Sequence, residues 1–130
     1  MRRHLEDDEA RALIRWRDLH ARRYPQLALL FAIPNGGKRN AREGARMKGM
    51  GVKAGVSDYL LPVPAGPFEQ PPQHYGLWLE LKQGKGKPTV AQAEWLTAMI
   101  GQGYAAEVAH GWVNAARKIC DYLGIKGIAP

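Results

Sequence analysis

The sequence predicts an α/β domain in which helices pack on the faces of a sheet. Three observations support this prediction: an amphipathic helical pattern opens the chain, short apolar runs follow it, and two further helical patterns flank the last of these runs. The composition, 45% apolar and 24% charged, is typical of a globular protein rather than a disordered chain. Because 130 residues fit one domain, we expect residues 1–130 to form a single domain.

The first half of the chain should supply two helices and two strands. Residues 5–23 are expected to form a helix that ends before Pro25. Residues 29–33 fit a buried strand followed by a turn, residues 39–48 a short helix, and residues 56–63 a second strand before a proline-rich loop. The first helix should bury a stripe formed by Leu5, Ala12, Leu13, Trp16, Leu19 and His20.

The second half should supply the remaining strands and helices. Residues 75–82 and 104–109 fit strands, and residues 89–101 and 111–123 fit helices. The helix over residues 89–101 opens with Thr89, and Gln92 three residues later completes the pattern of a capping box. The predicted order is therefore α-β-β-β-α-β-α, with a closing C-terminal helix.

The charge of the chain favours a polyanionic partner. Lys and Arg number 19 against 12 Asp and Glu, a formal net charge of +7. Residues 34–56 hold six of these cations, one acid and many glycines, so they fit either a surface that grips phosphates or a solvated loop. A further basic cluster comprises Lys82, Lys85 and Lys87.

Several classes of protein are excluded or disfavoured. One cysteine, Cys120, permits neither an intrachain disulfide nor a cysteine-rich zinc site. The longest apolar run, residues 27–34, is far shorter than the roughly 20 residues of a membrane helix. Acids follow the basic start where a signal peptide would be apolar. We therefore expect a cytoplasmic protein with no membrane association.

Two carboxylates on neighbouring predicted strands indicate a metal site. Strand alternation places Glu80 and Lys82 on one face, where they could instead form a simple ion pair. Asp58 lies in an apolar run although aspartate is disfavoured in strands, unless strand pairing begins only at Tyr59. If Asp58 lies beside Glu80, the two carboxylates would attract a divalent cation, and oxygen ligands favour Mg²⁺ or Mn²⁺.

Two further polar residues occupy apolar stripes. Glu9 lies near the middle of the stripe of the first helix, where it is either paired or metal-bound, or else an acid in a frayed first turn. Gln92 begins the buried stripe of the helix over residues 89–101, and it could either complete the helix cap or contact the site.

The order of these motifs resembles the virus-type replication-repair nuclease (VRR-NUC) branch of the PD-(D/E)xK nuclease superfamily. The resemblance covers roughly residues 6–123. Ser57 stands where the family usually has proline, which is not a ligand. Ala10 stands where the family often has glutamine, so Glu6 and Glu9 both remain candidates for the acid of the first helix, with Glu9 favoured by its place on the stripe. The matching features are Glu6/Glu9, Arg15-Trp16, Pro34-Asn35-Gly36-Gly37, the segment 51–58, Glu80-Leu81-Lys82, the segment 86–89, Gln92 and Gly103-Tyr104.

The resemblance implies a restriction-endonuclease-like αβββαβ core and metal-dependent hydrolysis of phosphodiester bonds. Asp58, Glu80 and the Leu81 carbonyl would hold Mg²⁺, or Mn²⁺ in its place, with Glu9 helping. Lys82 would orient the attacking water, and Gln92 would position Lys82 or the phosphate. DNA would be bound by basic and polar residues: Asn35, Lys38, Arg39, Arg42, Arg46, Lys48, Lys53, Lys85 and Lys87.

The resemblance also implies a biological setting. Stand-alone domains of this family look similar to bacterial or phage-encoded repair enzymes that act as homodimers on branched DNA such as four-way (Holliday) junctions. The alternative is a non-catalytic, basic nucleic-acid-binding module in which Glu80 and Lys82 form a salt bridge. A sequence-specific restriction enzyme is disfavoured, because 130 residues leave little room for a base-reading domain.

Overall fold

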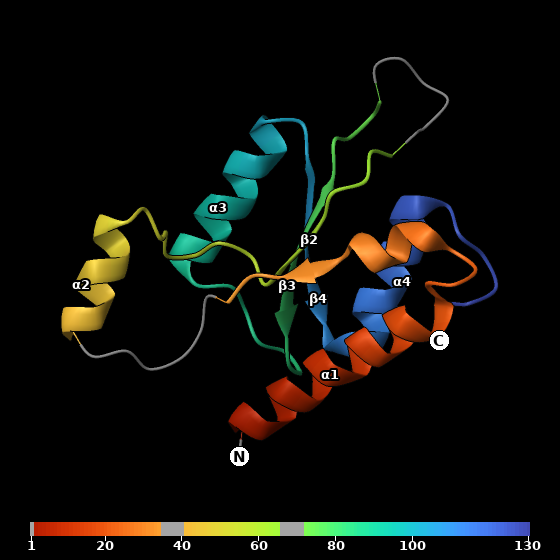
Figure 1. Cartoon of the computed structure of the whole chain (residues 1–130), viewed down its shortest axis with the longest axis horizontal. Coiled ribbons are helices and arrows are strands. Elements are labelled where there is room, and N and C mark those ends of the chain that lie inside the picture. Colours follow the sequence, from red (N-terminus) through yellow and green to blue (C-terminus); the bar gives the residue numbers. More distant parts are fainter. Residues whose placement is uncertain (1, 35–40, 66–71) are drawn as a thin grey trace.

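A four-stranded sheet with helices on both sides forms the centre of the molecule (Figure 1). The computed structural model describes residues 2–34, 41–65 and 72–130. The elements follow one another as α1 (Arg2–His20), the 3-10 helix η1 (Pro25–Leu29), β1 (Phe31–Ala32), α2 (Ala41–Gly49), β2 (Tyr59–Leu61), β3 (Leu77–Lys82), α3 (Val90–Gly101), β4 (Ala105–His110) and α4 (Gly111–Leu123).

The sheet is mixed, and its strands follow the order of the chain. β1 and β2 pair antiparallel, as do β2 and β3, whereas β3 and β4 pair parallel across the α3 connection. A parallel pair needs such a crossover, since its strands start at the same edge. This arrangement confirms the predicted α/β fold with a central mixed sheet, flanking helices and an added C-terminal helix.

Strand alternation on β3 separates the main core from the opposite face of the sheet. Leu77 and Leu79 are fully buried in the core to which α1 and α4 contribute, whereas the Trp78 ring packs edge-to-face on Trp95 of α3. Glu80 lies on the same strand face as Trp78. The helix α3 therefore covers the face of β3 that presents the candidate site, while α1 and α4 stabilise the sheet from behind (Figure 1).

The prediction was wrong about the first strand and about part of the first helix. Residues 29–33 do not form a buried strand, because Pro25 starts η1 and only Phe31 and Ala32 pair, with both side chains exposed at the sheet edge. On α1, Leu13 and Trp16 are buried as expected, but Leu5 and Leu19 are exposed. Leu5 and Leu19 therefore lie on parts of the α1 surface that the described part of the chain leaves uncovered.

Within the described ranges, the helices are too short or too polar for any of them to cross a bilayer.

Candidate active site

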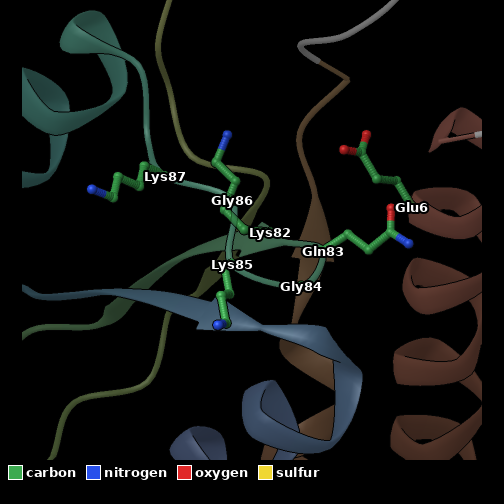
Figure 2. Close-up of a pocket in the computed structure, with 7 residues that line it drawn as sticks. All are labelled: Glu6, Lys82, Gln83, Gly84, Lys85, Gly86 and Lys87. Carbon is green, nitrogen blue, oxygen red and sulfur yellow. The ribbon is translucent and has the colours of Figure 1, made fainter.

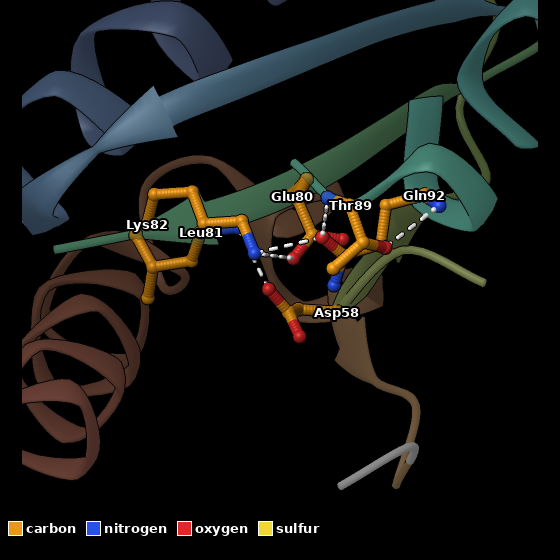
Figure 3. A network of polar contacts seen from close by, with 6 residues as sticks. All are labelled: Asp58, Glu80, Leu81, Lys82, Thr89 and Gln92. Atoms are coloured by element: carbon orange, nitrogen blue, oxygen red, sulfur yellow. Dashed lines mark hydrogen bonds and ion pairs between the residues drawn. The ribbon is translucent and has the colours of Figure 1, made fainter. Parts of the chain in front are cut away.

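The two carboxylates expected at the site lie on neighbouring strands. Strand pairing starts at Tyr59, which faces Leu79, and extending this antiparallel register by one residue places Asp58 opposite Glu80. The Asp58 carbonyl accepts a hydrogen bond from the Ile33 amide at 2.8 Å. Its Oδ2 accepts one from the Leu81 amide at 2.7 Å. Asp58 therefore immediately precedes β2, and its side chain is hydrogen-bonded to the backbone of β3 (Figure 3).

Glu80 is a buried carboxylate whose hydrogen-bonding capacity is only partly used. The residue is 2% exposed, and among the described residues its Oε1 atom has no hydrogen-bond partner. Burial, followed by repulsion from Asp58, raises the pKa of Glu80 to about 8, although Lys82 acts in the opposite direction. Such a raised pKa marks a carboxyl group that lacks a nearby positive charge sufficient to stabilise its ionised form.

Lys82 is held between Glu80 and the first turn of α3. Its Nζ lies 3.5 Å from Glu80 Oε2 and donates a hydrogen bond to Gln92 Oε1 at 2.7 Å. The same Gln92 side-chain oxygen accepts a hydrogen bond from the Thr89 backbone amide at 2.8 Å. In return, Thr89 Oγ1 accepts one from the Gln92 backbone amide at 3.2 Å. The predicted capping box is therefore confirmed, and Gln92 also contacts the lysine of the site (Figure 3).

A polar pocket of about 660 Å³ adjoins the end of β3. Glu6 reaches it from α1, and the remaining lining residues come from Lys82 and the turn that follows it (Figure 2). In that turn Lys85 and Lys87 are exposed. The residues that line the pocket therefore include three lysines and one glutamate, and the side chains of Lys85 and Lys87 point away from Glu6 (Figure 2).

A solved structure resembles this chain over almost its whole length. Neither the family models nor the curated proteins include a match to the chain. A solved structure described as a "VRR_NUC domain protein" aligns with 97% of this chain and 96% of its own, with a TM-score of 0.74 and 26% sequence identity. The chain has a VRR-NUC domain. This similarity agrees with the resemblance seen in the sequence.

The acid expected from the first helix of the VRR-NUC domain does not join the other two. Glu9 Oε2 accepts a hydrogen bond from the Trp112 amide at 2.6 Å, and the Glu9 carboxylate also lies against Gly111. Glu9 therefore caps the N-terminus of α4, where the helix dipole favours an anion. The described residues contain no group of three or more His, Cys, Asp or Glu arranged to hold a metal. Glu6, the other candidate, is the one that lines the pocket.

The predicted DNA-binding residues lie in two separate places. Arg42, Arg46 and Lys48 belong to α2, and Lys53 follows it; all four are exposed. Lys85 and Lys87 lie on the turn after β3, beside the pocket. The predicted residues Asn35, Lys38 and Arg39 lie outside the described ranges.

His110 is a contact of the site that the sequence did not reveal. The Nδ1 atom of His110 lies 2.9 Å from the Gly84 carbonyl oxygen. The His110 backbone amide donates a hydrogen bond to Asn114 Oδ1 at 3.0 Å. The parallel register aligns His110 with Lys82, so the end of β4 supports the turn that bears Lys85. Only this strand pairing, which spacing in the sequence does not specify, could have indicated the contact.

Proposed function

We propose that this nuclease domain is a metal-dependent DNA endonuclease that hydrolyses phosphodiester bonds. The observation that carries the proposal is the pairing of Asp58 with Glu80, a buried carboxylate with one unsatisfied oxygen, beside the ammonium of Lys82. When both acids are ionised, two carboxylates face one ammonium, so the cluster is then short of positive charge. A salt bridge alone would not explain why a second acid lies next to a buried one.

The residues at this position fit a hard divalent cation. The unsatisfied Glu80 Oε1, the Asp58 carboxylate and the Leu81 carbonyl are oxygen ligands of the kind that Mg²⁺ and Mn²⁺ prefer. When bound, Mg²⁺ would neutralise the carboxylates and polarise the phosphate and a water molecule. The raised pKa of Glu80 supports the assignment, because a cation would supply the positive charge that its ionised form lacks.

The remaining residues would orient the reactants. Lys82 would hold the attacking water and stabilise the negative charge that develops on the phosphate as a water oxygen replaces one ester oxygen. Gln92 would fix Lys82, because its amide oxygen is the shortest polar contact of the lysine ammonium in the described part of the chain. We assign to Glu6 the role of the acid from the first helix that helps to hold the metal. Glu9 is hydrogen-bonded at the N-terminus of α4, whereas Glu6 lines the pocket.

The DNA substrate follows from the domain type, and we propose that it is branched. Four-way junctions present two equivalent strands, which suits an enzyme that acts as a two-fold dimer. The outer face of α3 supports such a dimer: Val90 is 76% exposed, Ile100 is 58% exposed, and only Leu96 of the helix is buried. An apolar helix left exposed in this way is typical of an interface.

The dimer can be tested at this face. In sedimentation equilibrium we expect the wild-type chain to form dimers and Ala98→Arg, on the exposed side of α3, to remain monomeric. Ala129→Arg places the same charge at an exposed position of the C-terminal segment and should leave the dimer intact. A monomeric wild-type chain, or equal behaviour of the two variants, would remove this support for a two-fold enzyme.

The nuclease activity can be tested with a panel of single-stranded, duplex, flap and four-way DNA in Mg²⁺. Glu80→Gln and Lys82→Ala should abolish cutting while the chain stays folded and still binds DNA. Asp121→Asn makes the same carboxylate-to-amide change at an exposed site on α4 and should cut normally. Cutting that is unchanged in Glu80→Gln would refute the assigned site, and a preference for linear duplex would refute the junction.

The second candidate, a non-catalytic nucleic-acid-binding module, rests on the contact between Glu80 and Lys82, whose Oε2 and Nζ atoms lie 3.5 Å apart. It predicts binding that weakens with salt and does not depend on metal. Ca²⁺, which would occupy the acidic site without supporting hydrolysis, separates the candidates: it should tighten DNA binding by the nuclease and leave binding by the module unchanged or weaker.

A further inference from the structure

The helix α2 has little tertiary support. None of its side chains is buried, and its contacts with the other described helices and strands are sparse. Figure 1 shows it apart from the sheet, on the side of α3 that faces away from α1 and α4. Most helical stability in proteins comes from the packing of one face, so α2 lacks the usual source of its stability.

The sequence of α2 does not compensate for this lack of packing. The helix has nine residues, and isolated helices shorter than about 12 to 15 residues are marginal in water. Gly44 lies in its interior, where glycine disfavours the helix relative to alanine. Gly51 adopts a φ of 98°, and the Val52 amide bonds to the Met47 carbonyl at 3.1 Å, so the local sequence specifies where the helix ends. It does not make the helix stable.

The charge of α2 indicates what would stabilise it. Arg42 and Arg46 lie one turn apart, so their like charges repel along one side of the free helix. With Lys48 and Lys53 they make four cations, against the single acid Glu43, over residues 41–53. A polyanion would convert this repulsion into attraction, whereas an apolar protein partner would leave it in place.

The segment that follows α2 is anchored beside the candidate active site. Gly55 has a φ of 84° and packs so closely on the first turn of α3 that an added Cβ would lie 2.6 Å from the Ala91 backbone. Ala91 precedes Gln92, which bonds to Lys82, and Asp58 follows Gly55 after two residues. A short, anchored segment therefore links α2, which would bind an anionic chain, to the residues proposed to cut that chain.

We propose that α2 is a DNA-binding arm that completes its folding on the phosphate backbone of the substrate. In the free protein the helix forms only transiently, and phosphates bound by Arg42 and Arg46 hold it in place. This inference rests on the proposed function, and it adds a substrate-dependent ordering step to the same site. The cost of ordering α2 then lowers the affinity for DNA, so any change that orders the arm beforehand should raise it.

Hydrogen exchange measures the ordering directly. In full-length Glu80→Gln, a variant that keeps the substrate uncut, the amides of residues 41–50 should exchange at least tenfold more slowly with a short DNA duplex bound than in the free protein. The amides of α4 should be protected equally in both states. Bound DNA that leaves α2 unprotected, or an α2 that is already protected without DNA, would overturn the arm while the proposed nuclease stands.

Two matched pairs of variants test the energetic link. Gly44→Ala, where an added Cβ meets nothing within 4 Å, should tighten DNA binding by up to about fivefold. Gly101→Ala, at an equally open helical position on α3, should not tighten it. Unchanged or weaker binding by Gly44→Ala would contradict the ordering cost.

The second pair examines the phosphate contacts. Arg42→Ala with Arg46→Ala should reduce the slope of log affinity against log salt by about 1.8, since each lost phosphate contact removes about 0.9. Arg22→Ala with Lys126→Ala removes the same charge from exposed sites away from α2 and should leave the slope nearly unchanged. If both pairs of substitutions changed the slope equally, α2 would contribute only its charge, and the proposed DNA-binding arm would be refuted. A chain that binds no DNA under any of these conditions would refute both the arm and the nuclease.

Discussion

The affinity of the site for a divalent cation should depend steeply on pH, because Glu80 must lose a proton to bind it. Burial and Asp58 raise the pKa of Glu80 to about 8, so the carboxyl is protonated at neutral pH in the metal-free protein. A cation binds the ionised form, and its apparent affinity should therefore rise with pH and level off above the pKa. At pH 6 about 1% of Glu80 is ionised and at pH 9 about 90%, which predicts an affinity about 90-fold higher at pH 9.

Isothermal titration with Ca²⁺ measures this effect without hydrolysis. Titrations at pH 6, 7, 8 and 9, each in two buffers of different ionisation enthalpy, give both the affinity and the number of protons released. About one proton should leave on binding at pH 6 and about a tenth of a proton at pH 9. Asp121→Asn should behave as the wild type, and Glu80→Gln should lose tight binding. An affinity that changes less than threefold over this range, with no proton release, would refute the assignment of Glu80 as a buried ligand.

Three further outcomes follow from the contacts of the site. In EDTA the raised pKa of Glu80 means that the folded state keeps a proton which the unfolded chain loses, so stability should fall as pH rises from about 4.5 to about 8, by at most on the order of 5 kcal/mol. Glu80→Gln should abolish that fall in thermal melts, and an identical pH profile would contradict the pKa. Thr89→Ala should lower the free energy of unfolding by about 1 kcal/mol with little change in kcat, because the contact from Gln92 to the lysine remains, whereas Gln92→Ala should lower kcat tenfold or more. Equal losses of kcat would show that the helix cap is the whole role of Gln92. Glu6→Gln should reduce cleavage more than Glu9→Gln, and Glu9→Gln should reduce Tm more; the reverse order would restore Glu9 as the acid of the site.

Local patterns in the sequence were sufficient to predict most of the elements, and they indicated the pairing of two acids as one of two alternatives. Thr89 and Gln92 mark a helix start through contacts within one turn, and the capping box forms as predicted. Asp58 and Glu80 were expected side by side, and the strand register places them so. These features depend on short-range spacing and on one antiparallel pairing, which alternation and turn signals are able to indicate.

Features that depend on packing between distant elements were not predictable in this way. The apolar stripe on α1 suggested that Glu9 would face the site, but the orientation of α1 against α4 brings Glu9 to the Trp112 amide, 103 residues further along the chain. The apolar run around Phe31 suggested a buried strand, yet its position at the sheet edge leaves that side chain 45% exposed. The hydrophobicity of a side chain predicts that it favours burial, but the fold determines which partner buries it.

The structural alternatives for Asp58, Glu80 and Gln92 each describe an arrangement that exists, yet none of them is sufficient. Strand pairing does begin at Tyr59, Glu80 does face Lys82, and Gln92 does cap α3. The ion pair nevertheless leaves Glu80 Oε1 unsatisfied among the described residues, and the capping oxygen of Gln92 also accepts from Lys82. A purely structural arrangement would not need a buried acid beside a second acid, because an apolar residue at Glu80 would avoid the repulsion. Under the proposed function, the local contacts are the means by which the fold holds a group of mutually repelling charges in place for a cation and a phosphate.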